Sequence, residues 1–177
     1  MSWLRIRHFV LILGIWLCGC SASLSPQEKS MLGFILVQPS DLRAVSILPQ
    51  GLGVTSSAVL QINLRDAQGA VIEEQKFQLA RSGSAIDPSS GQNRVNFALN
   101  RGDRRKFQLL QARLLAMLGQ PTRVQLGVIM TYCADGQAPS AAQPPVAQLI
   151  NYDTGDVLLH STAPSPAAAI AASAPRC

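Results

Sequence analysis

Histidine, a common general base and metal ligand, is nearly absent from this chain of 177 residues. It occurs only at His8, close to the N-terminus, and at His160, near the C-terminal end. A single histidine cannot provide the cluster of histidines and carboxylates that a catalytic zinc ion needs, and a serine triad would depend on His160 alone as its base. We therefore expect no catalytic residue, no metal site and no cofactor, and we interpret His160 as a surface residue at a strand end.

The acidic residues also lack the arrangement of a catalytic pair. Asp153-Thr154-Gly155 spells the tripeptide of aspartic proteases, in which two aspartates share one proton, but the tripeptide occurs once. A hairpin turn explains it better. Glu73 and Glu74 are adjacent on an expected strand, where neighbouring side chains point to opposite faces. These patterns predict a protein that is not an enzyme.

Basic residues cluster at the expected start of a helix. The cluster consists of Arg101, Arg104, Arg105 and Lys106. The first turn of a helix carries positive dipole charge and favours acids, so three consecutive bases there break a local rule, and such violations can mark functional sites. One hypothesis is that the cluster binds an anionic partner, such as lipid headgroups, lipopolysaccharide phosphates or an acidic protein face. The alternative is a solvated cluster neutralised by Asp103 and water.

The first 19 residues have the parts of an export signal. Arg5 and Arg7 form a basic start, residues 9–17 are an apolar run, and Leu17-Cys18-Gly19-Cys20 follows. The apolar run is about half of the roughly 20 residues needed to cross hydrocarbon, so a permanent transmembrane helix is the poorer interpretation. Leu17-Cys18-Gly19-Cys20 resembles the bacterial lipobox.

That resemblance implies transfer of diacylglycerol to Cys20, cleavage of the chain before it, and acylation of the new amino group. Several acyl chains on one residue give durable attachment to a membrane. Ser21 stands where the enterobacterial sorting pattern places Asp for retention in the inner membrane. We therefore expect an outer-membrane lipoprotein that faces the periplasm, with the membrane as one partner.

Two cysteines remain free after this processing, Cys133 and Cys177. The compartment outside the cytoplasm permits disulfides. A bridge between them would fix the C-terminal end to a strand and would stabilise the fold by about 4 kcal/mol in the chain-entropy model, and by less in practice. The alternative is a partly buried Cys133 and a Cys177 that stays reactive or pairs with another molecule.

The composition predicts one domain of ordinary size. We expect a signal peptide over residues 1–19, a lipid-anchored linker over 20–30, a single β-rich periplasmic domain over 31–160, and a flexible tail rich in Ala and Pro over 161–177. The formal charge is +5 and falls by two when the signal is removed. Because the remaining charges are mostly scattered, we expect no nucleic-acid partner.

Alternation of apolar and polar residues indicates strands along most of the domain. In the clearest case, Ala58, Leu60, Ile62 and Leu64 alternate with polar residues, and the chain returns after Gly69 as a hairpin. Seven strands are expected, over residues 42–48, 58–65, 71–79, 94–100, 122–132, 146–152 and 157–160.

One amphipathic helix is expected over residues 103–118, with Asp103 as its cap. Its apolar stripe consists of Phe107, Leu110, Leu114 and Met117. Residues 31–37 are apolar and fit either a buried strand or a short helix. The predicted fold is therefore mainly β, like a β-sandwich of about seven antiparallel strands with one helix, and the alternative is a two-layer α+β arrangement.

A lipobox followed by a short linker and a strand-rich domain is broadly similar to small lipoproteins that assist secretion systems, such as secretin pilotins. The strands and loop of residues 58–99 carry this likeness. We expect an adaptor or structural accessory that binds another envelope component, through strand edges or through the helix of residues 103–118. The alternatives are a module that binds lipid or glycan and, less favoured, an envelope hydrolase.

Overall fold

The computed structural model describes residues 26–86, 90–118, 120, 122–138 and 143–177. The predicted signal peptide and Cys20 lie outside the described residues.

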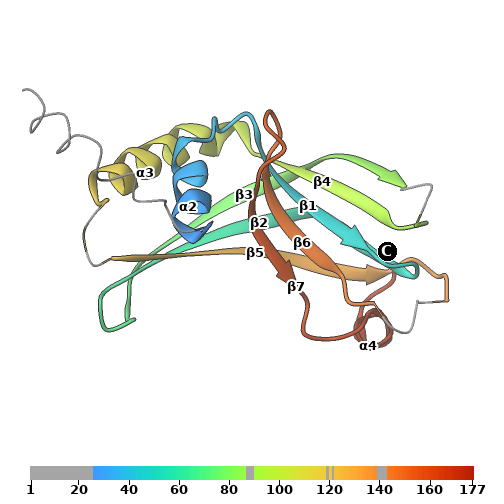
Figure 1. The fold of residues 1–177 in the computed structure, drawn as a ribbon. Helices are drawn as coiled ribbons and strands as arrows, with labels where there is room; N and C mark the ends of the chain where they lie inside the picture. The colour runs from blue at the N-terminus through green and yellow to red at the C-terminus, as the bar shows by residue number, and fades with distance from the viewer. Residues whose placement is uncertain (1–25, 87–89, 119, 121, 139–142) are drawn as a thin grey trace, which may run out of the picture.

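Within the described residues, seven antiparallel strands form one sheet in the order β5-β2-β3-β4-β1-β6-β7. Their bounds are β1 Leu42–Leu48, β2 Leu52–Arg65, β3 Val71–Ile86, β4 Asn93–Leu99, β5 Arg123–Ala134, β6 Val146–Asn151 and β7 Val157–Thr162. The sheet curves until β5 approaches β6, so that it is nearly closed (Figure 1). The predicted mainly β fold with seven antiparallel strands is confirmed.

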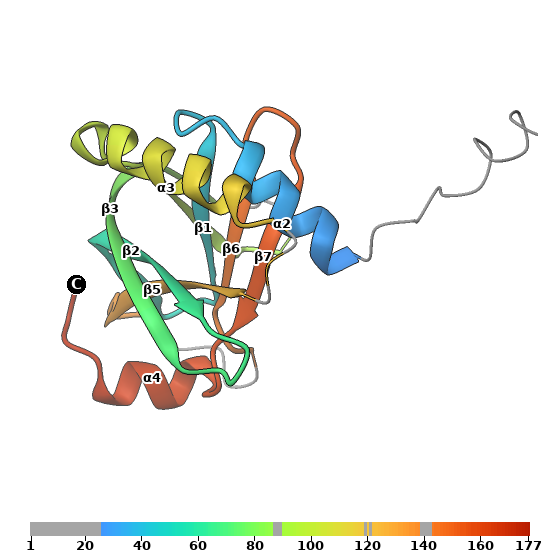
Figure 2. The ribbon, with the colours of Figure 1, turned by 90° about the vertical axis from the view of Figure 1, so that its left-hand side faces the viewer.

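Three helices accompany the sheet in the described residues: α2 (Pro26–Leu36), α3 (Arg104–Ala116), preceded by a short 3-10 turn, and α4 (Ala167–Ser173). Figures 1 and 2 show α2 and α3 together on one side of the sheet and α4 on the other. The sequence predicts one helix because only α3 has a clear apolar stripe at helical spacing.

β2 and β3 form the predicted hairpin. Leu60 pairs with Phe77 across it, and Gly69 in the turn has a φ of 88°, which glycine adopts without strain. The alternating apolar residues of β2 are buried as expected. However, β3 continues to Ile86, beyond the predicted strand of residues 71–79, because β4 offers pairing partners as far as Asn93.

Residues 26–36 form a helix, which resolves the alternatives for the segment 31–37 and places its first turn inside the predicted linker 20–30. Pro26 suits the first helical position. Met31, Phe34 and Ile35 lie at helical spacing and pack into the core. Gly33 lets the helix approach β7 closely, since an added Cβ would lie 2.9 Å from Leu158 Cδ2.

Three phenylalanines join α2, α3 and the sheet. The Phe107 ring of α3 lies 5.5 Å from the Phe34 ring and 5.3 Å from the Phe77 ring, both edge to face. All three side chains are fully buried. Edge-to-face pairs of this kind each add about 1 kcal/mol beyond the burial of apolar area.

Gln111 is a buried polar residue within the apolar stripe of α3. Its Nε2 donates to the carbonyl oxygens of Phe34, at 3.0 Å, and of Val37, at 2.8 Å. These carbonyls belong to the C-terminal end of α2, where backbone acceptors lack partners within the helix. Gln111 thus caps α2 from another helix and fixes the two helices relative to each other.

The predicted flexible tail of residues 161–177 is ordered instead. β7 reaches Thr162, α4 follows, and Ala167 is fully buried. Small side chains add little core volume, but alanine is the best helix former, and here the chain end is also held by the disulfide of Cys177. The Ala134 N–H donates to the carbonyl of Pro175 at 2.8 Å, which anchors the tail to the end of β5.

Candidate functional site

The residues considered for catalysis lie apart on the surface. His160 on β7 is exposed, and its Nδ1 lies 3.2 Å from Nε2 of Gln148. Asp153 lies in the turn between β6 and β7, where its N–H donates to Oδ1 of Asn151. Among the described residues, no group of three or more His, Cys, Asp or Glu could hold a metal ion.

The two adjacent glutamates each form an ion pair on β3. Glu73 pairs with Arg113 of α3 at 2.7 Å, and Glu74 pairs with Lys76. The Glu73 pair connects the outer part of α3 to the sheet. Neither glutamate faces a second acid, so their contacts are structural.

The predicted basic cluster is divided by the structure. Nζ of Lys106 lies 5.1 Å from the centroid of the Phe77 ring, and Nε of Arg104 is buried without a hydrogen-bond partner. Arg101 and Arg105 are exposed. Lys106 is exposed as well, so three of the four basic residues reach solvent, and Arg104 is half-buried.

Asp103 does not cap α3 as predicted. Its backbone occupies the cap position, but its side chain makes no capping hydrogen bond. Instead its Oδ2 accepts from the backbone N–H of Gln78 at 2.8 Å, and Asn100 accepts from Gly102 in the preceding turn. The carboxylate therefore ties the start of α3 to β3, a contact that the local sequence could not indicate.

The outer face of α3 carries a second apolar stripe besides the buried one. Its large members are Leu109 and Leu115 on the helix and Leu118, two residues past its end, and they have 67%, 50% and 48% of their surface exposed. Ala112 lies between them at helical spacing and is exposed too, and Arg105 begins the same face. We call these residues, from Arg105 to Leu118, the outer stripe of α3.

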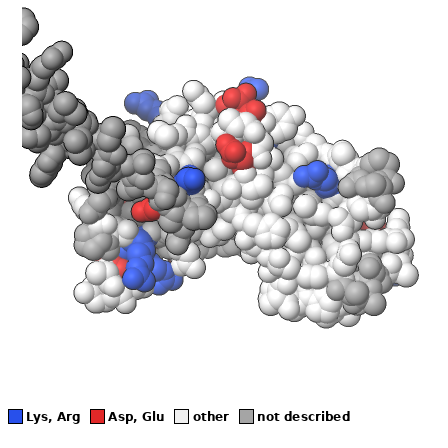
Figure 3. All heavy atoms as spheres, viewed as in Figure 1, with Lys and Arg blue, Asp and Glu red and all other residues white. Residues whose placement is uncertain are grey.

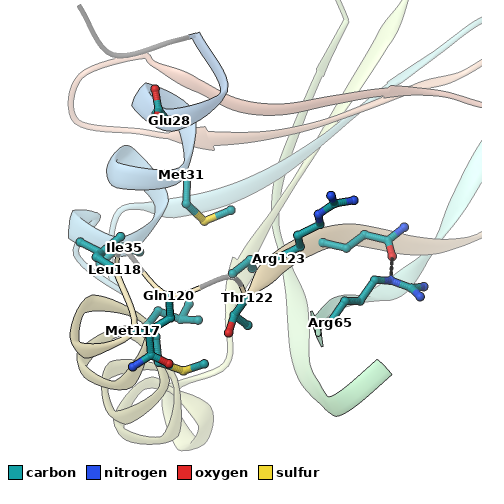
Figure 4. A pocket seen from close by; sticks show the side chains of 12 residues that line it. Glu28, Met31, Ile35, Arg65, Met117, Leu118, Gln120, Thr122 and Arg123 are labelled. Carbon is teal, nitrogen blue, oxygen red and sulfur yellow. Dashed lines mark hydrogen bonds between the residues drawn. The ribbon is translucent and has the colours of Figure 1, made fainter. Parts of the chain in front are cut away.

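An open groove of about 610 Å³ lies where α2, the end of α3 and the start of β5 meet. Its helical wall is formed by apolar side chains: Met31, Ile35, Leu114, Met117 and Leu118. Its opposite wall, on β2 and β5, carries polar and basic groups (Figure 4). The groove is therefore amphipathic across its width.

Arg65 and Arg123 stand on the strand side of this groove. They are direct cross-strand partners of the β2–β5 pair. Nε of Arg65 donates to Oε1 of Gln125 at 2.8 Å, and its Nη1 donates to the carbonyl of Gly69 at 2.6 Å. The ion pairs found in the described part of the chain involve neither arginine.

Cys133 and Cys177 form the predicted disulfide, which closes a sequence separation of 44 residues. Gly53 of β2 faces the bridge, because a Cβ at this position would lie 2.5 Å from Sγ of Cys177. Next to Cys133 on β5, Tyr132 packs against the core, and burial raises the pKa of its phenol above the ordinary value of 10.0. This end of β5 is therefore a structural region.

The sequence analysis missed Gln111, the outer stripe and the groove. A polar residue inside an apolar stripe and leucines on the second face of a helix are visible signals for the first two. The groove has no local signal, because its walls come from distant segments.

No family model, curated protein or solved structure matches this chain. Within the described residues, no helix is long and apolar enough to cross a membrane.

Proposed function

We propose that this protein is a lipid-anchored adaptor of the outer membrane, attached through Cys20 and facing the periplasm, which holds another envelope protein through the outer stripe of α3. The observation that carries this proposal is that α3 is apolar on two faces. The face bearing Phe107 and Leu110 is buried in the core. The face bearing Leu109 and Leu115 is exposed, and exposed apolar patches often mark contact surfaces.

The charges around the outer stripe specify the partner's chemistry. Arg101 and Arg105 are exposed at its beginning, and Arg113 is on the same helix, with its charge already paired with Glu73. A partner face with apolar residues in the centre and acids opposite Arg101 and Arg105 would complement this surface. This combines the predicted basic cluster with the predicted helix contact in one interface.

The groove is open rather than an enclosed apolar cavity, which favours a docking role over that of a carrier that encloses its ligand. The disulfide suits the oxidising compartment in which such an adaptor would work.

The interface is tested by photocrosslinking in the cell. A photoreactive phenylalanine analogue at Ala112, in the middle of the outer stripe, should give one stoichiometric adduct with an envelope protein. The same analogue at Ile86, which is 70% exposed at the far end of β3, is the matched control and should give none. Equal adducts from both positions, or none from Ala112, would contradict the proposal.

Two variants separate the interface from the anchor. Leu109→Ser with Leu115→Ser should abolish the adduct while leaving the unfolding midpoint nearly unchanged, because exposed side chains contribute little to stability. Cys20→Ala should move the protein out of the outer-membrane fraction. Unchanged fractionation of Cys20→Ala would refute the anchor even if the crosslink persisted.

A further inference from the structure

We propose that the groove between α2, α3 and β5 binds one anionic phospholipid of the membrane that carries the anchor. An acyl chain lies against the helical wall, and the phosphate sits between Arg65 and Arg123. The site uses residues outside the outer stripe except Leu118. It rests on the proposed anchor at Cys20 but not on the proposed protein partner.

The arginine pair is the first reason for an anion. Like charges placed directly opposite each other on antiparallel strands destabilise the pair. Arg65 and Arg123 occupy such positions, and the hydrogen bonds of Arg65 go to neutral acceptors. Asp66, next in the chain, uses its Oδ1 to accept from the N–H of Ala70 in the hairpin turn.

A phosphate between the two guanidinium groups would offset their repulsion. Guanidinium groups bind phosphate oxygens through paired, charge-assisted hydrogen bonds. Figure 3 shows basic side chains gathered at the lower left of the molecule, over the start of β5 and the nearby β2–β3 turn, with a few acidic atoms beside them. A phosphate could therefore approach this corner from solvent.

The helical wall supplies the second half of an amphiphile site. Met31 and Met117 face the groove from two different helices (Figure 4). Methionine side chains are flexible and adapt to irregular apolar ligands such as acyl chains. The basic and apolar walls face each other, as a headgroup with an attached chain requires.

The position of the groove along the chain favours a membrane lipid as the occupant. Five residues, and so six peptide steps, separate Cys20 from Pro26 at the start of α2. A segment of this length spans at most about 20 Å, so an anchor at Cys20 would keep the groove close to the bilayer surface. Glu28 is also on this first part of α2, with a contact of its own, and Figure 4 shows it at the end of the groove away from Arg65.

Native mass spectrometry of the full lipidated chain tests this proposal. The protein in non-ionic detergent is mixed with equal amounts of phosphatidylglycerol and phosphatidylcholine that have identical acyl chains. We expect the phosphatidylglycerol adduct to exceed the phosphatidylcholine adduct by about tenfold. In the variant Arg65→Gln with Arg123→Gln, the two adducts should become equal.

The matched control is Arg81→Gln with Arg94→Gln, which removes the same charge from two exposed arginines remote from the groove. It should keep the preference of the unaltered protein, and unfolding midpoints should show that both double variants are folded. A preference that survives loss of Arg65 and Arg123, or that falls equally in the control, would overturn the proposal. Binding of oleate without binding of phosphatidylglycerol would also overturn it, since the occupant would then be a free fatty acid.

Discussion

Replacing Gln111 by leucine should destabilise the protein more than any exposed substitution on the same helix. Leucine keeps most of the side-chain volume, so the apolar packing of α3 is largely preserved. The change removes the donors to two carbonyl oxygens, those of Phe34 and Val37. Gln111 is 7% exposed, so little water can reach these acceptors.

The expected magnitude follows from those two acceptors. Leaving a buried hydrogen-bonding group unsatisfied costs about 1–3 kcal/mol. Carbonyl oxygens tolerate this better than donors do, so we expect a loss of about 2–4 kcal/mol in the free energy of unfolding. For a domain of this size, the loss corresponds to a fall in Tm of roughly 4–16 °C.

Urea unfolding followed by circular dichroism measures this loss, with Gln108→Leu as the matched control. Gln108 is exposed on the same helix, and its replacement should change the unfolding free energy by less than about 0.5 kcal/mol. If Gln111→Leu were as stable as the unaltered protein, or if Gln108→Leu lost as much, the capping role would be refuted.

Gln111→Glu adds a test with a defined pH dependence. A buried carboxylate facing two carbonyl oxygens has a folded pKa raised above its unfolded value, because both burial and the carbonyl dipoles disfavour the charge. The stability of this variant is therefore retained below the unfolded pKa and is lost as the pH rises through the folded pKa. Equal stability of the variant in acid and at neutral pH would contradict the assigned geometry.

Three further outcomes are expected. Cys177→Ser should lower the unfolding free energy by about 2–4 kcal/mol, since the bridge closes a separation of 44 residues, and hydrogen exchange should show α4 opening first. Gly53→Ala should lower the free energy of unfolding by about 1–3 kcal/mol, because its Cβ would lie 2.5 Å from Sγ of Cys177. In a double-mutant cycle with Cys177→Ser, the combined loss of unfolding free energy should be smaller than the sum of the two single losses. Burial raises the pKa of Tyr132. Its contribution to stability is therefore present below the ordinary pKa of 10.0 and is lost as the pH rises through the folded pKa. Unfolding measured as a function of pH should show that Tyr132→Phe removes this alkaline loss of stability.

The sequence by itself determined the elements whose signals are local. Alternation at period two identified β2 and the strands paired with it, since one face of each strand must be apolar. The buried face of α3 followed from spacing at period 3.6, and the hairpin turn from Gly69. The disulfide could be proposed from the two remaining cysteines, because only one pairing was available.

Tertiary structure alone decided the features that join distant segments. The register of β2 against β5 sets Arg65 opposite Arg123, and no local pattern encodes which residue of one strand faces which residue of another. In the sequence, Gln111 is only a polar residue within an apolar stripe. Its role follows from the fold, in which α2 places two carbonyl oxygens beside it. The alanine-rich tail lacks a polar and apolar period, so its order depends on the surface of the sheet and on the bridge at Cys177. The physical reason is common to all three: long-range contacts supply a free energy that short-range patterns do not contain.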